Sequence, residues 1–141
     1  MSLVVPDVGE IALLNKLLIN VLSSDERYIL KLYKNNLPPA NTTVQGTFTE
    51  CTFTSYAART LSRAGWTTAV TASLKGESSY AGIQSWTCGT SGNTVYGYWV
   101  VGDAKNIGTV LWAELFSTAR VIASGDILNI TPKFTLMSEY S

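Results

Sequence analysis

The sequence contains no histidine, and this absence removes the side chain that enzymes use most often for proton transfer. Histidine is the only side chain whose unperturbed pKa lies near neutrality, and it is also the commonest metal ligand. Catalysis would have to rely on carboxylates, lysine, cysteine or a serine–lysine pair, and no phosphate-binding loop or nucleophile motif is present. We therefore expect no enzyme activity, no catalytic or metal-binding residues and no cofactor.

Charged residues are also scarce, at 14% of the 141 residues, and ten acidic side chains balance ten basic ones. A soluble domain usually carries about 25% charged residues. A nucleic-acid-binding surface needs clustered Lys and Arg to neutralise several phosphates, but here the basic residues are scattered. We expect neither nucleic acid nor a membrane as a partner. The low charge favours buried subunit interfaces, unless Thr, Ser and Asn supply the missing polarity.

Long hydrophobic runs and a secretion signal are absent as well. No apolar stretch reaches the roughly 18 residues that span a bilayer, and the start Met1-Ser2-Leu3 lacks a basic region and a cleavage site. We expect a protein made in the cytoplasm without a signal peptide. Cys51 and Cys88 have no metal-binding spacing, so we expect small apolar core residues, with a disulfide formed after release from the cell as the alternative.

The beginning of the chain has the periodicity of an amphipathic helix over about residues 7–22. Asp7 and Glu10 are suited to a helix start, because their oxygens can accept bonds from free backbone N–H groups. The apolar positions recur every three or four residues: Val8, Ile11, Leu14, Leu18 and Val21. Such a stripe must be buried against a sheet, against a second copy of the chain, or both.

From about residue 27 the apolar period changes to two, which is typical of half-buried strands. Tyr56–Leu61 could be a helical turn or an edge strand, and Pro132 predicts an edge strand or a bulge because proline cannot donate to a neighbour. The strand candidates are 28–33, 66–74, 80–88, 94–101, 109–116 and 128–136. This pattern predicts one domain over residues 1–141, with an antiparallel β-sandwich or jelly-roll-like barrel (about 27–137) after the amphipathic α-helix.

Two groups of residues could carry chemistry. Glu50 and Glu114 are the carboxylates best placed to be partly buried, and a glycosidase would need them about 5 to 9 Å apart. The plainer interpretation is that Glu114 forms an ion pair with Arg120, Lys105 or a partner chain. Tyr96, Tyr98 and Trp99 form a candidate aromatic binding surface, and strict alternation places Tyr96 and Tyr98 on the face opposite Trp99. Exposed aromatics could stack on sugars or contact a protein partner, whereas buried ones would belong to the core.

Several segments together suggest a family. The leucine-rich N-terminal helix, the run from Leu30 to Asn36 with its proline-containing loop, Phe48-Thr49-Glu50, Gly125-Asp126 and Thr131-Pro132-Lys133-Phe134 look like parts of small virion proteins of tailed bacteriophages. The likeness covers nearly the whole chain and contains no catalytic motif. It implies a structural protein located in the virion, with a capsid decoration (cement) protein first and a tail or baseplate component second.

This resemblance implies that the chain binds the major capsid protein or another virion protein, as a homo-oligomer. Our candidate interface elements are the helix stripe and the edge of the last strand. The corresponding residues are Ile11, Leu14, Leu18, Lys133, Thr135 and Met137. The alternative is a tail, baseplate or fibre component with a carbohydrate-binding surface.

Overall fold

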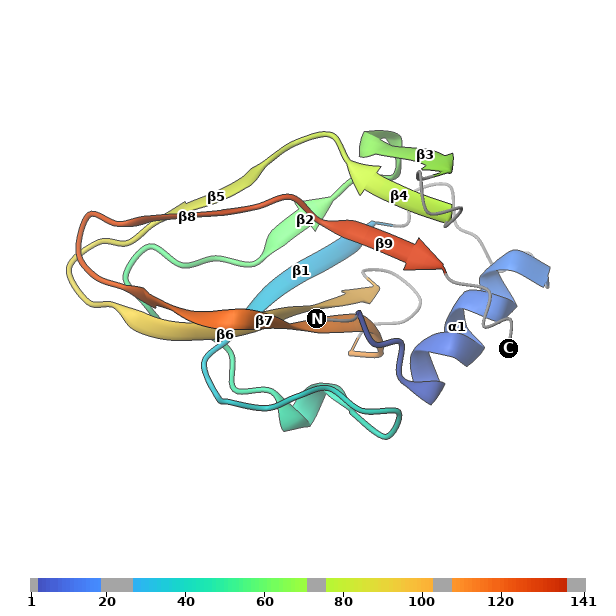
Figure 1. Ribbon diagram of the computed structural model, residues 1–141, viewed down its shortest axis with the longest axis horizontal. Helices are drawn as coiled ribbons and strands as arrows, with labels where there is room; N and C mark the ends of the chain where they lie inside the picture. Colours follow the sequence, from blue (N-terminus) through green and yellow to red (C-terminus); the bar gives the residue numbers. More distant parts are fainter. Residues whose placement is uncertain (1–2, 19–26, 71–75, 103–107, 137–141) are drawn as a thin grey trace.

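A computed structural model describes residues 3–18, 27–70, 76–102 and 108–136 of the chain. The protein is mainly β, with antiparallel sheets and one N-terminal helix, so the predicted sandwich-like fold class is confirmed (Figure 1). Its elements are α1 (Asp7–Leu18), β1 (Tyr28–Tyr33), η1 (Gln45–Thr47), β2 (Arg59–Leu61), η2 (Arg63–Gly65), β3 (Trp66–Val70), β4 (Gly76–Tyr80), β5 (Gln84–Thr87), β6 (Asn93–Gly102), β7 (Val110–Ile122), β8 (Ile127–Ile130) and β9 (Lys133–Leu136).

The central sheet has the strand order β2-β1-β6-β7 and is antiparallel throughout. Alternation along β1 is as the sequence predicts: Leu30 and Leu32 enter one core cluster, whereas Tyr33 enters another on the opposite face. The ambiguous segment 56–61 ends in β2, which is the edge strand of this sheet. The edge-strand alternative is therefore the right one for Arg59–Leu61.

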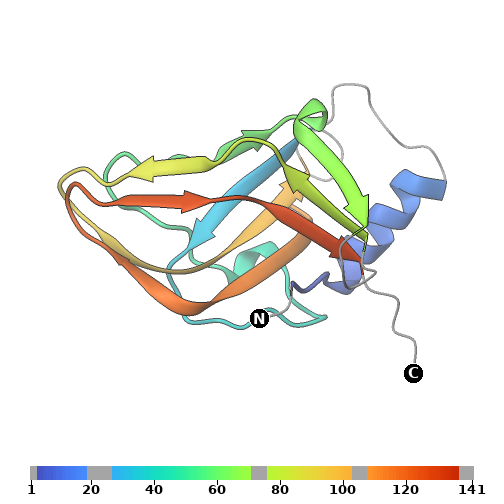
Figure 2. The same ribbon diagram turned by 45° about the horizontal axis from the view of Figure 1, so that its top comes forward.

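The second layer consists of the three-stranded sheet β3-β4-β9 and the two-stranded sheet β5-β8, which continue one another (Figure 2). The predicted strands 80–88 and 128–136 are both interrupted here, between Tyr80 and Gln84 and at Pro132. Pro132 has no N–H, but its carbonyl accepts the Tyr80 N–H at 2.9 Å across the interruption. As Pro132 suggests, the strand is broken there, and β9 lies at the edge of its sheet.

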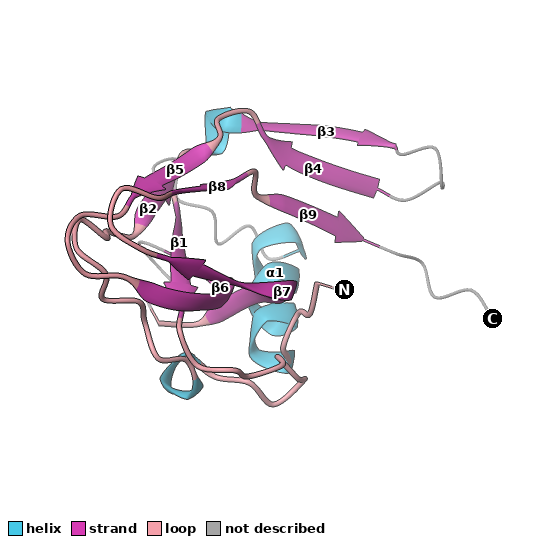
Figure 3. Ribbon diagram, turned by 60° about the vertical axis from the view of Figure 1, so that its left-hand side comes forward, coloured by secondary structure: helices cyan, strands magenta, loops and turns pink. Residues whose placement is uncertain are grey.

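The other face of the central sheet is covered by the irregular segment 34–48, which includes the short helix η1 (Figure 3). Two cores result. The larger one lies between the two strand layers and contains Phe53 and Trp86. The smaller one contains Tyr33, Phe48 and Trp99, and the rings of Phe48 and Trp99 stack with centroids 4.9 Å apart. Strand β6 is consequently buried on both faces, which explains its nearly continuous apolar run.

Helix α1 contacts β7 through its smallest side chains. A Cβ at Gly9 would stand 2.6 Å from the Val110 carbonyl oxygen, and Ala12 is buried. Val8 and Ile11 point away, with 40% and 61% of their surface exposed. Of the two alternatives for the stripe, burial against the sheet does not hold for these two residues, because the close approach to the β7 backbone admits only small side chains. Burial against a second copy of the chain stays a prediction. The predicted helical residues 19–22 lie outside the described part.

Candidate functional site

The most irregular feature of the sheet is a wide bulge in β7. From Gly97 to Val95, β6 advances by two residues, but the paired residues on β7 run from Leu115 to Arg120 and advance by five. Strand β7 therefore carries three extra residues opposite Tyr96. Bulges re-aim side chains and disrupt edge pairing, and they are common beside binding sites. This bulge interrupts the edge strand of the central sheet near its midpoint.

A polar cleft of about 350 Å³ adjoins the bulge, and we call it the bulge cleft. It lies where β7, at the edge of one layer, faces β8 and the start of β9 in the other. Its volume falls within the roughly 300 to 1,000 Å³ range of small-ligand sites. The lining residues are Tyr98, Glu114, Phe116, Ser117, Arg120, Leu128, Asn129, Ile130, Thr131 and Lys133.

Two buried tyrosines hold Glu114 from opposite faces of the sheet. The Tyr98 hydroxyl donates to Oε2 of Glu114 at 2.9 Å. The Tyr33 hydroxyl shares its proton between the Glu114 backbone carbonyl at 3.3 Å and the Leu37 carbonyl at 3.2 Å. Burial, and then the charge of Glu114, raise the pKa of both tyrosines above the usual value of 10. Both hydroxyls therefore remain protonated donors at physiological pH, and the carboxylate is fixed in place before any ligand arrives.

Gly97 makes this arrangement possible. It lies on β6 opposite Leu115, next to the bulge. A Cβ at this position would run into the Glu114 carbonyl oxygen and the Tyr33 hydroxyl, the two atoms that bond to each other across the sheet. Only glycine leaves room for that hydrogen bond.

Several polar groups around the cleft still have hydrogen-bonding capacity. Within the described residues, Oε1 of Glu114 and the Arg120 guanidinium have no hydrogen-bond or ion-pair partner. Asn129 uses its Oδ1 to accept a bond from Ser85 at 2.5 Å, which leaves its amide hydrogens for another acceptor. Lys133 forms an ion pair with Glu77 at 3.3 Å. The bulge cleft thus offers a carboxylate acceptor together with cationic and amide donors.

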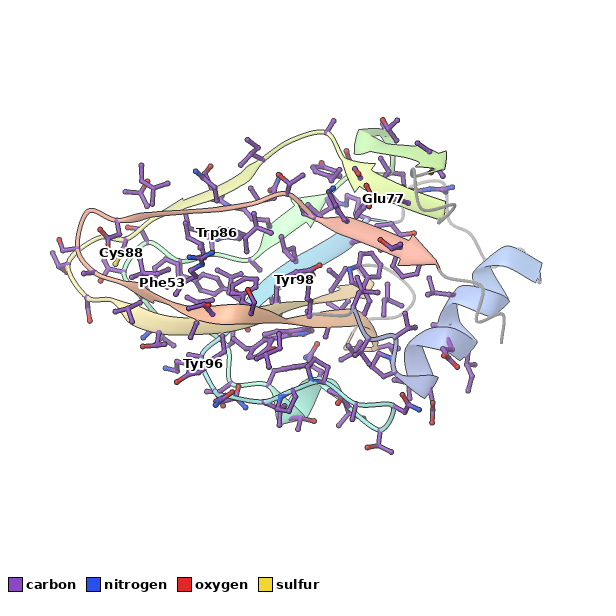
Figure 4. All side chains as sticks on the ribbon, in the orientation of Figure 1. Phe53, Glu77, Trp86, Cys88, Tyr96 and Tyr98 are labelled. Atoms are coloured by element: carbon purple, nitrogen blue, oxygen red, sulfur yellow. The ribbon has the colours of Figure 1, made fainter. Side chains whose placement is uncertain are left out.

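The predicted aromatic surface is not formed. Tyr98 and Trp99 are 3% and 1% exposed, in the larger and smaller core respectively, so neither ring can serve as a stacking platform. Tyr96 is half-buried and packs on the same side as Trp99, not Tyr98. Figure 4 shows Tyr96 and Tyr98 on opposite sides of the sheet. Strict alternation gave the wrong face for Tyr96 because the register shifts between Val95 and Gly97.

The two carboxylates singled out in the sequence are not brought together. Glu50 bridges to Tyr33 at the outer side of β1, while Glu114 lies on β7 with β6 between. Three strand spacings of about 4.8 Å separate their backbones by roughly 14 Å. Glu50 instead pairs with Lys31 at 3.3 Å and accepts the Tyr56 hydroxyl at 2.9 Å. Glu114 bonds to Tyr98 and forms no ion pair with Arg120 within the described residues, and Lys105, the other expected partner in the chain, lies outside them.

The structure brings the two predicted interface elements next to each other. Leu13 of α1 and Phe134 of β9 line one apolar cavity of about 240 Å³ together with Tyr28, Trp66 and Trp112; we call this the aromatic cavity. Ile11 lies exposed on α1, Lys133 is exposed at the start of β9, and Thr135 is half-buried. The backbone of Leu14 and Leu18 belongs to α1, but their side chains lie outside the described part, as does Met137.

Cys51 and Cys88 are both free and buried in the larger core, as apolar core residues would be. Burial raises the pKa of the Cys51 thiol to about 12. The described residues contain no group of three metal-ligating side chains. None of the helices described is long and apolar enough to cross a membrane. The chain matches no known family model and no curated protein sequence.

Proposed function

We propose that this chain is a non-enzymatic structural protein of a tailed-bacteriophage virion. In this role it binds the assembled capsid, bridges neighbouring copies of the major capsid protein and associates with further copies of itself. The observation that carries the proposal is the juxtaposition of α1 and β9 around the aromatic cavity. Two elements that the sequence marks for association, far apart along the chain, share one surface.

The exposed side of α1 also supports binding by burial of apolar area. The side chain of Ile11 is 61% exposed although smaller residues of the same helix make the contact with the sheet. Each Å² of apolar surface removed from water contributes about 25 cal/mol, so covering a few such side chains stabilises a contact by several kcal/mol. Formal charge neutrality removes long-range repulsion between copies.

Binding to an assembled shell stabilises the shell by mass action. A protein that binds the closed arrangement and not the separate subunits shifts the equilibrium towards assembly. Many equivalent copies multiply a modest energy per site. No catalytic step is needed for this role.

A tail, baseplate or fibre component is the second candidate, and the bulge cleft is the observation in its favour. A fibre would use a polar cleft to contact a receptor, whereas a capsid decoration protein needs only its association surface. The two candidates differ in copy number, because a shell presents hundreds of equivalent positions and a tail tip only a few.

The test is the location and copy number of the chain in purified virus particles. Image reconstruction and quantitative mass spectrometry, with the major capsid protein as the reference, measure both. We expect density on the outer capsid surface between neighbouring subunits and a stoichiometry comparable to that of the shell protein. A few copies at the tail would overturn the capsid role in favour of the second candidate, and absence from the particle would overturn both.

A further inference from the structure

The bulge cleft contains a carboxylate that is held by hydrogen bonds but still has a free acceptor oxygen. Glu114 receives one hydrogen bond from Tyr98 on its side chain and one from Tyr33 on its backbone, and Gly97 is needed for the latter. Holding a charged group in a half-buried cleft costs solvation energy. Stability alone does not require such an arrangement, because an apolar side chain at this position would avoid that cost.

The free hydrogen-bonding groups of the cleft define the ligand. Oε1 of Glu114 can accept a hydrogen bond, while Arg120 and the Asn129 amide can donate. An amine would pair with Glu114 but would be repelled by Arg120 and Lys133. An anion would be attracted by these two cations but repelled by the Glu114 carboxylate. An uncharged ligand that both donates and accepts avoids both penalties.

The apolar part of the cleft lining restricts the chemical class of the ligand further. Phe116 lies at the bulge with its ring 6.3 Å from that of Tyr98, at an interplanar angle of 46°, and it lines the cleft together with Leu128. A saccharide ring has hydroxyls around its edge and C–H groups on its faces, which suits polar groups at the rim and an aromatic side chain in the wall.

We propose that the bulge cleft is a saccharide-binding site. Glu114 accepts a sugar hydroxyl, Arg120 and Asn129 donate to neighbouring oxygens, and Phe116 contacts a face of the ring. Tyr98 is a positioning residue that acts through Glu114. The site lies apart from the aromatic cavity, with which it shares no lining residue, so the inference does not depend on the capsid role.

The test is ligand-observed NMR on the full chain with a panel of neutral hexoses, N-acetylhexosamines and their disaccharides. We expect saturation transfer to at least one saccharide, with a dissociation constant on the order of 1 mM, typical of a weak single-site contact. Free amino acids form a second arm, because a zwitterion could place its ammonium on Glu114 and its carboxylate on Arg120.

Two variants and a matched control locate the binding. Glu114→Gln removes the charge at the site and should weaken saccharide binding at least tenfold, as should Arg120→Ala, which alters an exposed residue and leaves the core intact. Glu10→Gln removes the same charge from the exposed surface of α1 and should bind like the parent. Circular dichroism verifies that each variant is folded. The proposal is overturned if no saccharide binds, if only amino acids bind, or if both cleft variants bind like the parent.

Discussion

The bulge cleft and the outward surface of α1 differ in how they depend on the core. Glu114 is held by the buried residues Tyr98 and Tyr33, so changes to its supports must affect the stability of the whole sandwich. Ile11 stands away from the sheet because Gly9 and Ala12 make the contact below it. The geometry of the cleft therefore depends on buried residues, whereas the exposed side chains of α1 can be changed without altering the core.

Alkaline pH should have the largest effect, because it removes the stability that the protonated hydroxyls of Tyr33 and Tyr98 contribute. Tyr33 and Tyr98 have their pKa raised in the folded state, so their contribution to stability is complete below pH 10 and is lost as the pH rises further. Above that pH the unfolded chain loses protons that the folded chain retains, and the free energy of unfolding falls by about 1.4 kcal/mol per pH unit for each tyrosine. Together they remove about 3 kcal/mol per pH unit.

Urea denaturation monitored by tryptophan fluorescence, at a series of pH values from about 8 to about 11, measures this slope. Tyr98→Phe should reduce the slope by close to one proton, and Ile11→Ser should leave it unchanged. An unaltered slope in Tyr98→Phe would show that this tyrosine does not carry the shifted pKa.

Gly97→Ala should be the most damaging single substitution near the cleft. The added methyl group would collide with the Glu114 carbonyl oxygen and the Tyr33 hydroxyl, and overpacking of this kind costs about 2 kcal/mol. Gly76→Ala is the matched control, because a Cβ there meets nothing within 4 Å. Urea denaturation of both variants gives the comparison. Equal stability of the two would contradict the close approach of β6 to Tyr33.

Ile11→Ser should have the smallest effect on stability, within about 0.5 kcal/mol, because the side chain is largely exposed. The substitution should nevertheless abolish self-association. A second variant, in which Leu14 and Leu18 are also replaced by Ser, extends the test along the predicted stripe. Analytical ultracentrifugation measures the number of copies in solution.

The matched control for the helix is Val121→Ser. Val121 is a 76% exposed valine near the turn between β7 and β8, and that turn lies at the end of the molecule opposite α1 (Figure 1). This variant should associate like the parent. If Ile11→Ser and the multiple variant also associate normally, the outward surface of α1 is not an interface.

Much of the fold could be predicted because local patterns agree with the tertiary environment. The alternation of Tyr28–Tyr33 identifies β1 and the residues on each face, since a strand between two cores buries both sets of side chains. Pro132 indicated the interruption between β8 and β9 through its missing N–H.

The candidate site was accessible from the sequence only in part. Glu114 stood out as a carboxylate within an apolar run, but its partner Tyr98 was assigned to an exposed surface. The bulge shifts the register of β6 against β7 between Val95 and Gly97. No local sequence pattern predicts the three extra residues on the opposite strand. Arg120 was considered only as an ion-pair partner of Glu114, and nothing in the sequence indicated Asn129, because an ordinary polar residue acquires a role here only by facing the same cleft.

The sequence by itself determined the class of structure: absence of histidine, neutral charge, period-two strands and one apolar helix stripe are local or summed properties that need no knowledge of contacts. Only the tertiary structure decided which side chains meet. The pairing of β6 with β7 that sets Tyr98 opposite Glu114, and the close approach to β7 that turns Ile11 outward, both depend on residues distant in the chain. The same is true of the register shift that places Tyr96 on the other face. Periodicity reports which residues prefer burial, whereas register and close packing decide what each of them touches.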